Sequence, residues 1–300
     1  MSWRTVVVTK CSKLDLNLGY MVIRDAEGSK RIFLDEVAVL ICETPAISLT
    51  CALIEACVKN KIKVIFCDRT HSPSAELMPY HNSYNSLARI EEQMSWPKQI
   101  KDEIWDFIVK EKIRNQAYLL QLQGHEENSK ALFYCADEVN SGDISNREAV
   151  AAKIYFITLF GKSFSRDEPI PVNKALNYGY SLILSAFNRA VTSLGYLTQV
   201  GLKHKNAFNP FNFSCDLMEP FRPLIDDRVL HMDIKDFSIK EKHELLAIFN
   251  SDYIIREKRQ TLFNAIDLYV HGIIKALNNE NLQEIIPFSL QEVSLCREDS

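Results

Sequence analysis

The chain changes its local pattern once, near residue 80, and this change constrains the fold more than any other feature. Before that point, short β-branched and aromatic runs alternate with turns, as in WRTVVVT (residues 3–9), GYMVIR (19–24) and IKVIFC (62–67). Such runs are typical of strands. Residues 49–59 differ, because their apolar side chains recur at helical spacing. We therefore expect a small β-rich domain with one helix over residues 1–80.

The remainder of the chain has a helical pattern. Prolines and turn-forming residues in segment 68–86 predict a linker. Amphipathic or apolar segments then predict helices over residues 100–122, 146–160, 174–202, 239–249 and 253–277. The expected fold class is α+β, with the β-rich domain followed by a larger all-α domain over residues 87–300. That domain ends in an acidic tail after Pro287.

Composition excludes several classes of protein. Hydrophobic residues make up 47% and charged residues 25% of the 300, as in globular proteins. No apolar run reaches the ~18–20 residues that span a bilayer, and the start MSWRTVVVTK lacks a signal-peptide core. The eight cysteines include no Cys-x-x-Cys pair, which excludes a zinc ribbon. We expect a cytoplasmic protein without a membrane partner. The net charge of −4 does not by itself indicate nucleic-acid binding.

Two polar clusters interrupt the helical half. In the first, Ser145-x-x-Glu148 fits a capping box, so capping alone explains Glu148 at this point. In the second, residues 201–222, His204 follows a long predicted helix, while Asp216 and Glu219 begin the next one. Each of these charges is also favourable at its helix end. Three asparagines and three phenylalanines between them show no sustained period, which predicts an ordered loop.

Taken together, Glu148, His204 and Glu219 suggest a second interpretation. Two carboxylates and an imidazole without a thiolate suit Mg²⁺ or Mn²⁺ better than structural zinc. Such a metal acts as a Lewis acid on a phosphoryl oxygen. The residues alone leave capping and metal binding both open.

Several motifs resemble one family, the CRISPR-associated adaptation integrases, the larger subunit of the spacer-acquisition complex. They are residues 67–80 (CDRTHSPSAELMPY), Asn115-Gln-Ala, Arg147-Glu-Ala, Asn177-Tyr-Gly-Tyr180, Gly201-x-x-His204 and residues 209–223 (NPFNFSCDLMEPFRP). The Met-Glu-Pro-Phe-Arg-Pro form is most similar to the branch found in type II systems. The resemblance implies a β-rich N-terminal domain followed by an α-helical catalytic domain.

The resemblance also implies the site. Its metal ligands match Glu148, His204 and Glu219, which are therefore the expected catalytic residues, with Asp216 as an auxiliary residue behind them. Lys203 stands where some relatives carry another histidine, so the choice of His204 depends on the Gly201-x-x-His204 spacing. The implied reaction is metal-dependent transesterification, in which the 3′-hydroxyl of a DNA fragment attacks a phosphodiester at the edge of a CRISPR repeat. With water as nucleophile, the same chemistry gives endonuclease activity.

The partners implied are double-stranded DNA, a second copy of the chain, a small ferredoxin-like subunit and other type II adaptation proteins. The apolar run Val6–Val8 is a candidate dimer edge. The candidate DNA contacts are Lys203, Lys205, Arg222 and Tyr178. Arg222 can either orient Glu219 at i, i+3 or hold a phosphate, and tyrosines in an apolar helix are more often core.

Two alternative functions remain open. A structure-specific repair nuclease acting alone predicts cleavage of branched DNA without a partner or a repeat. A non-catalytic DNA scaffold predicts that Glu148→Ala and His204→Ala leave function intact.

Overall fold

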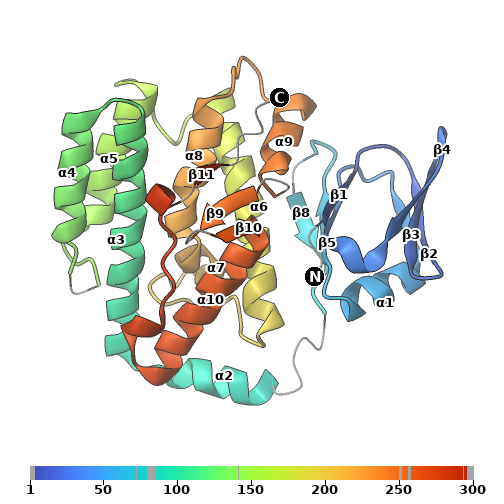
Figure 1. Cartoon of the computed structure of the whole chain (residues 1–300), viewed down its shortest axis with the longest axis horizontal. Coiled ribbons are helices and arrows are strands. Elements are labelled where there is room, and N and C mark those ends of the chain that lie inside the picture. Colours follow the sequence, from blue (N-terminus) through green and yellow to red (C-terminus); the bar gives the residue numbers. More distant parts are fainter. Residues whose placement is uncertain are drawn as a thin grey trace. The chain divides into compact units, whose positions relative to one another are not determined.

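The computed structural model of the chain describes residues 4–71, 73–79, 86–140, 142–249, 252–255, 258–292 and 294–295. The chain divides into two units, Met1–Asn82 and Ser83–Ser300. Figure 1 draws the first unit in blue and cyan and the second from turquoise, at α2, through green and yellow to red. Strands dominate the first unit and helices the second, which confirms the predicted α+β class.

The first unit contains two four-stranded sheets. One has the order β1-β5-β7-β8, in which β1, β5 and β7 are parallel and β8 is antiparallel to β7. Its strands are β1 (Arg4–Val8), β5 (Val37–Cys42), β7 (Lys63–Cys67) and β8 (Pro73–Glu76). The other has the order β4-β3-β2-β6. Its strands are β2 (Lys13–Asn17), β3 (Tyr20–Asp25), β4 (Gly28–Phe33) and β6 (Ser48–Leu49).

The core of this unit draws on both sheets and on helix α1 (Cys51–Lys59). All six residues of β5 are buried, which explains why VAVLIC is a continuous apolar run rather than an alternating one. Thr50 begins α1 by accepting the backbone N–H of Leu53 at 3.3 Å. Burial also raises the pKa of Cys42 to about 12 and of Cys57 to about 11, so both thiols stay protonated at neutral pH.

Two elements of the first unit differ from expectation. Strand β8 lies within the segment expected to be a linker, because Pro73–Glu76 pairs with β7 and Glu76 forms an ion pair with Lys63 at 2.5 Å. Strand β2 was missed, since only two apolar residues, Leu14 and Leu16, mark its alternation. Residues 80–85 of the expected linker lie outside the described residues.

Long helices make up most of the second unit. Figure 1 shows α3 beside α4 and α5, and these three pack on one another. The helices are α2 (Ser86–Ser95), α3 (Lys98–Leu122), α4 (Glu126–Asp137), α5 (Arg147–Phe160), α6 (Pro171–Ser193), α7 (Asn212–Leu217), α8 (Arg222–Leu230), α9 (Ile239–Leu246) and α10 (Leu262–Asn279). Short 3-10 turns include η2 (Glu219–Phe221) and η5 (Leu290–Glu292). Among the described residues, no helix is both long and apolar enough to cross a membrane.

The second unit is not all-α, and two expected helices were wrong in extent. Helix α6 ends at Ser193 rather than at residue 202, because Gly195 follows with a φ of +88° and closes the helix. The helix expected from Tyr253 begins only at Leu262, where Thr261 caps it. Before it, β9 (Asp252–Ile255) and β10 (Lys258–Thr261) form a small antiparallel sheet with β11 (Ser294–Leu295).

Candidate active site

Helix α3 supplies one wall of the candidate site. Trp105, Lys112 and Asn115 stand on one face of it, and all three are largely or fully buried. They belong to the stripe that Ile104, Ile108 and Leu119 otherwise fill with apolar side chains. Polar residues on such a stripe need partners in the interior. Lys112 finds them on α5 and η2, and Asn115 finds them on η2 and the C-terminal segment.

Glu148 lies in the first turn of α5, but not through the predicted capping box. Asn146 precedes the helix with a φ of +54°, and no side-chain cap forms there. Asp143 does the capping, because its carboxylate accepts the backbone N–H groups of Arg147 at 2.7 Å and of Glu148 at 3.1 Å. The expectation for Ser145 was therefore wrong. The Glu148 side chain does not cap the helix; its Oε1 accepts a hydrogen bond from Lys112 Nζ at 2.6 Å.

His204 lies in a loop, eleven residues after Ser193 at the end of α6, so it does not interact with the C-terminus of that helix in the way that its alternative role required. Its imidazole Nδ1 pairs with the buried carboxylate of Asp216. The same carboxylate accepts the backbone N–H groups of Leu202 at 2.7 Å and of Lys203 at 2.9 Å, which fixes the loop on α7. The Trp105 and His204 rings also meet at right angles, with their centroids 5.4 Å apart. Both contacts hold the imidazole in one orientation.

Asp216 also sets the electrostatics of His204. Its hydrogen bond is the main cause that raises the pKa of His204 above 6.5, although burial acts in the opposite direction. A carboxylate on one ring nitrogen leaves the other, Nε2, available for a ligand, an arrangement that recurs behind metal-binding histidines. Asp216 thus contacts His204 from behind the imidazole, and its role as an auxiliary residue stays a prediction.

Gly201 explains why the Gly-x-x-His spacing matters. A Cβ atom at Gly201 would stand 2.6 Å from the carbonyl oxygen of His204 and 2.8 Å from Asp216 Oδ2. Real Cβ contacts do not approach so closely, so only glycine allows Asp216 to reach the loop. The loop is further ordered by Asn212, whose amide donates to the carbonyl oxygens of Gln199, Asn206 and Asn209.

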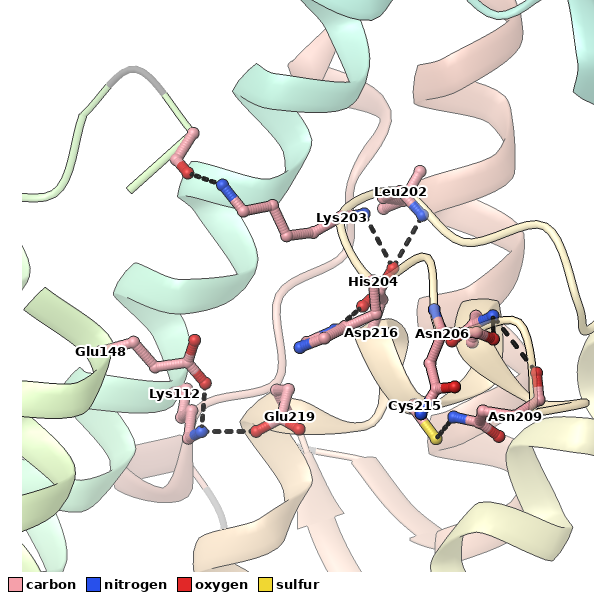
Figure 2. Close-up of polar contacts among 12 residues, drawn as sticks. Lys112, Glu148, Leu202, Lys203, His204, Asn206, Asn209, Cys215, Asp216 and Glu219 are labelled. Atoms are coloured by element: carbon pink, nitrogen blue, oxygen red, sulfur yellow. Dashed lines mark hydrogen bonds and ion pairs between the residues drawn. The ribbon is translucent and has the colours of Figure 1, made fainter. Parts of the chain in front are cut away.

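Glu219 begins η2 and is bound through both of its oxygens. Lys112 Nζ lies 2.5 Å from Oε2, and Arg222 Nε donates to Oε1 at 2.8 Å. Burial alone would raise the pKa of Glu219, but the charges of Arg222 and Lys112 outweigh it and lower the pKa. Figure 2 shows Glu148 and Glu219 meeting at the same ammonium group, with the His204 ring above them.

Asn115 anchors this arrangement from behind. Its amide nitrogen donates to the carbonyl oxygens of Pro220 at 2.8 Å and Phe288 at 2.9 Å, and its oxygen accepts the N–H of Leu290 at 2.9 Å. One side chain thus fixes both η2 and the C-terminal segment on α3. A buried amide with these three partners holds Glu219 at its position.

A second buried network supports Arg222. Its guanidinium lies over the Tyr180 ring, 4.6 Å from the centroid, and the Tyr180 hydroxyl pairs with Asp226. The Tyr155 hydroxyl donates to the other oxygen of Asp226 at 2.9 Å. Arg222 is therefore held between Glu219 and Tyr180.

The candidate DNA contacts have different surroundings. Arg222 orients Glu219, the first of the two roles considered for it. Tyr178 is buried against Phe237 and Lys242, which argues against a direct DNA contact. Lys203 Nζ donates to the carbonyl oxygen of Gly142 at 2.5 Å and joins the two loops of the site. Lys205 is exposed.

Two carboxylates and one imidazole are donor groups that a divalent cation can bind, but here they are not arranged as a complete set of ligands. Among the described residues, no three His, Cys, Asp or Glu side chains are close enough together to hold a metal ion. Two carboxylates nevertheless converge on one positive charge, that of Lys112, beside an imidazole held by a carboxylate. Glu148, Glu219 and His204 are thus the residues that would hold a metal.

Sequence reasoning missed Lys112, Trp105 and Asp143 as parts of the site, and it named Asn115 only within a family motif, without a role. Lys112 and Asn115 left a signal, because each interrupts the apolar stripe of a long helix at a core position. Asp143 had a weaker one, as an acid just before a helix. Nothing in the local sequence separates Trp105 from an ordinary core residue.

Fold and site together define an α+β protein with a carboxylate–imidazole site built into its helical unit. Residues 5–247 match the family described as CRISPR associated protein Cas1. The CRISPR-associated endonuclease Cas1 of Neisseria meningitidis serogroup C (strain 8013) is 32% identical over 297 residues, covering 96% of this chain and 98% of that protein. The chain belongs to the Cas1 family.

Solved structures share the fold at low sequence identity. A casposase bound to its integration product superposes with a TM-score of 0.77 at 20% identity, over 100% of this chain and 96% of that chain. A chain of a Cas6-RT-Cas1–Cas2 complex gives a TM-score of 0.75 at 16% identity, over 96% of this chain and 36% of that one. At such identities the likeness concerns the fold alone.

Proposed function

We propose that the chain is a metal-dependent DNA integrase and endonuclease, which inserts short DNA fragments as new spacers into a CRISPR array. The observation that carries the proposal is the meeting of Glu148 and Glu219 at one cation beside an imidazole held by Asp216. Membership of the Cas1 family supports it, as does the casposase, whose structure contains an integration product.

The site residues have distinct roles in this reaction. Glu148, Glu219 and His204 would hold Mg²⁺ or Mn²⁺. When bound, the metal would neutralise charge that develops on the phosphate oxygens. Asp216, Trp105 and Asn115 keep the three ligands in place before the substrate arrives, so that little reorganisation is needed during the reaction.

The chain's own chemistry is mainly positioning. The 3′-hydroxyl of the incoming fragment must lie in line with the scissile phosphodiester at the repeat edge, so that a new ester bond forms as the old one breaks. The bond that breaks is the P–O3′ bond of the scissile phosphodiester, and the released strand end leaves as a 3′-hydroxyl, so that the proton lost by the attacking hydroxyl is balanced by the one gained at the leaving oxygen. Lys203 and Lys205 flank His204 and favour phosphates at this mouth of the site.

The assembly proposed is a homodimer bridged by a small ferredoxin-like subunit, acting on double-stranded DNA together with other type II adaptation proteins. Strand β1 is the outer strand of its sheet, so its free edge offers a surface for a second copy. The solved relative with Cas2 in its complex supports the small partner. Cytoplasmic location belongs to the same proposal.

Strand transfer on labelled branched DNA tests the proposal, with wild type and His204→Ala compared in Mg²⁺, in Mn²⁺ and in EDTA. Metal-dependent rejoining that is abolished in the variant, with DNA binding retained, is the expected result. Cleavage without rejoining would instead indicate the stand-alone repair nuclease. Equal function in wild type and variant would indicate the non-catalytic scaffold.

A further inference from the structure

Four charged side chains form a balanced set at the candidate site. Glu148 and Glu219 carry the negative charges, and Lys112 and Arg222 carry the positive ones. The Lys112 side chain is 11% exposed and that of Glu219 is 6% exposed. Lys112 Nζ lies within ion-pair distance of both Glu148 and Glu219, so it acts as the counter-ion of the two carboxylates.

A divalent cation bound to both carboxylates would upset this balance. With Lys112 still in place, the buried set would carry an excess of two positive charges, which a low-dielectric interior disfavours. The ammonium also lies 2.6 Å from one carboxylate and 2.5 Å from the other, so it occupies the position from which both can bind a cation.

Lys112 is the cation of the set that is able to leave. Its charge stands at the end of a flexible four-carbon stem. Arg222, in contrast, is fixed between Glu219 Oε1 at 2.8 Å and the Tyr180 ring at 4.6 Å. The other titratable groups nearby have partners of their own, because Asp226 binds Tyr155 and Tyr180, and His204 binds Asp216.

We propose that Lys112 is a built-in counter-ion, which holds Glu148 and Glu219 together in the metal-free protein and which the metal must displace. This inference rests on the proposed function, because it takes these carboxylates as metal ligands. Lys112 is then a positioning residue that sets the metal affinity. It keeps the two carboxylates near each other at low metal concentration and makes metal binding weaker than the ligands alone would give.

The test measures Mn²⁺ binding by electron paramagnetic resonance, and thermal melting with EDTA or Mn²⁺, for wild type and Lys112→Met. Methionine has nearly the length of lysine without its charge. The variant should bind Mn²⁺ about tenfold more tightly or better, since no counter-ion must be displaced. In EDTA it should melt below wild type, because two buried carboxylates face each other unpaired, and Mn²⁺ should raise its melting temperature more than that of wild type.

Lys130→Met is the matched control, because Lys130 forms a surface pair with Glu127 at 3.0 Å and should leave the Mn²⁺ affinity unchanged. Lys112→Gln, which is neutral but polar, provides the same comparison if the methionine variant fails to fold in EDTA. Wild-type binding with equal or weaker binding by both Lys112 variants would overturn the inference and leave the proposed function intact. Absence of Mn²⁺ binding in all proteins would overturn both.

Discussion

Gly201 is the residue whose replacement gives the sharpest test of the His204 loop. In Gly201→Ala the new methyl group collides with the His204 carbonyl oxygen and with Asp216 Oδ2, so the imidazole must shift. We expect strand transfer to fall about a hundredfold, because a misplacement of about 1 Å has effects of this size. A melting curve close to that of wild type would show that the loss is local. Full activity in Gly201→Ala would contradict the assigned role of the loop.

The raised pKa of Asp226 predicts that the free energy of unfolding depends on pH. Burial raises the pKa of this carboxyl from 3.8 to about 6. The folded chain thus holds this proton more tightly than the unfolded chain. The contribution of Asp226 to the free energy of unfolding therefore decreases as the pH rises from about 4 to about 6. The Asp226→Asn variant has no carboxyl group at this position, so it does not show this decrease. Its free energy of unfolding relative to wild type should rise by about 2 kcal/mol between about pH 4.5 and about pH 7.5.

Urea unfolding followed by tryptophan fluorescence measures this difference. Trp96 and Trp105 both belong to the unit that contains Asp226. A difference between variant and wild type that stays constant over the same pH interval would show that Asp226 is ionised normally.

At the scale of the element, the N-terminus of α5 depends on Asp143. Asp143→Ala removes the acceptor for two backbone N–H groups, those of Arg147 and Glu148, and should lower the free energy of unfolding by about 1–2 kcal/mol. Ser145→Ala is the matched control, since Ser145 makes no cap and should be nearly neutral. Both free energies are measured by chemical unfolding. An equal decrease in the two variants would indicate that Ser145 caps α5 after all.

Helix and strand boundaries show what local sequence can and cannot predict. The periodicity of residues 100–122 identified α3 almost to its ends, because its buried stripe is long and regular. The end of α6 was placed too late, since apolar residues continue after Gly195 has already turned the chain. Strand β8 was missed because its pairing with β7 is a tertiary interaction that proline-rich sequence does not indicate.

The site itself was predicted only in part. Glu148, His204, Glu219 and Asp216 were chosen from motifs, and the structure brings Glu148 to Glu219 and His204 to Asp216. Lys112 was not chosen, because its importance comes from a three-way contact between helices distant in the sequence. The charge balance of a buried cluster becomes visible only when its members are placed together.

At the scale of the whole molecule, the proposed homodimer can be tested at β1, which is the outer strand of its sheet in the described part of the chain. A lysine on an edge strand opposes pairing with another strand, so Val7→Lys should shift the proposed dimer to a monomer in light scattering. Leu18→Lys is the control, because Leu18 is 85% exposed in the turn between β2 and β3. If the Val7→Lys protein remains dimeric, the two copies of the chain do not pair through β1.

Helix α3 also limits how the length of this chain can vary. Trp105, Lys112 and Asn115 lie seven and three residues apart on one face of the helix. They contact the imidazole, the carboxylates, and η2 with the C-terminal segment, respectively. One inserted residue between them would rotate everything beyond it by about 100° and break these contacts in a single event. Insertions and deletions that preserve function should therefore fall outside residues 105–115. Within this stretch, functional relatives should differ by substitutions and not by insertions or deletions.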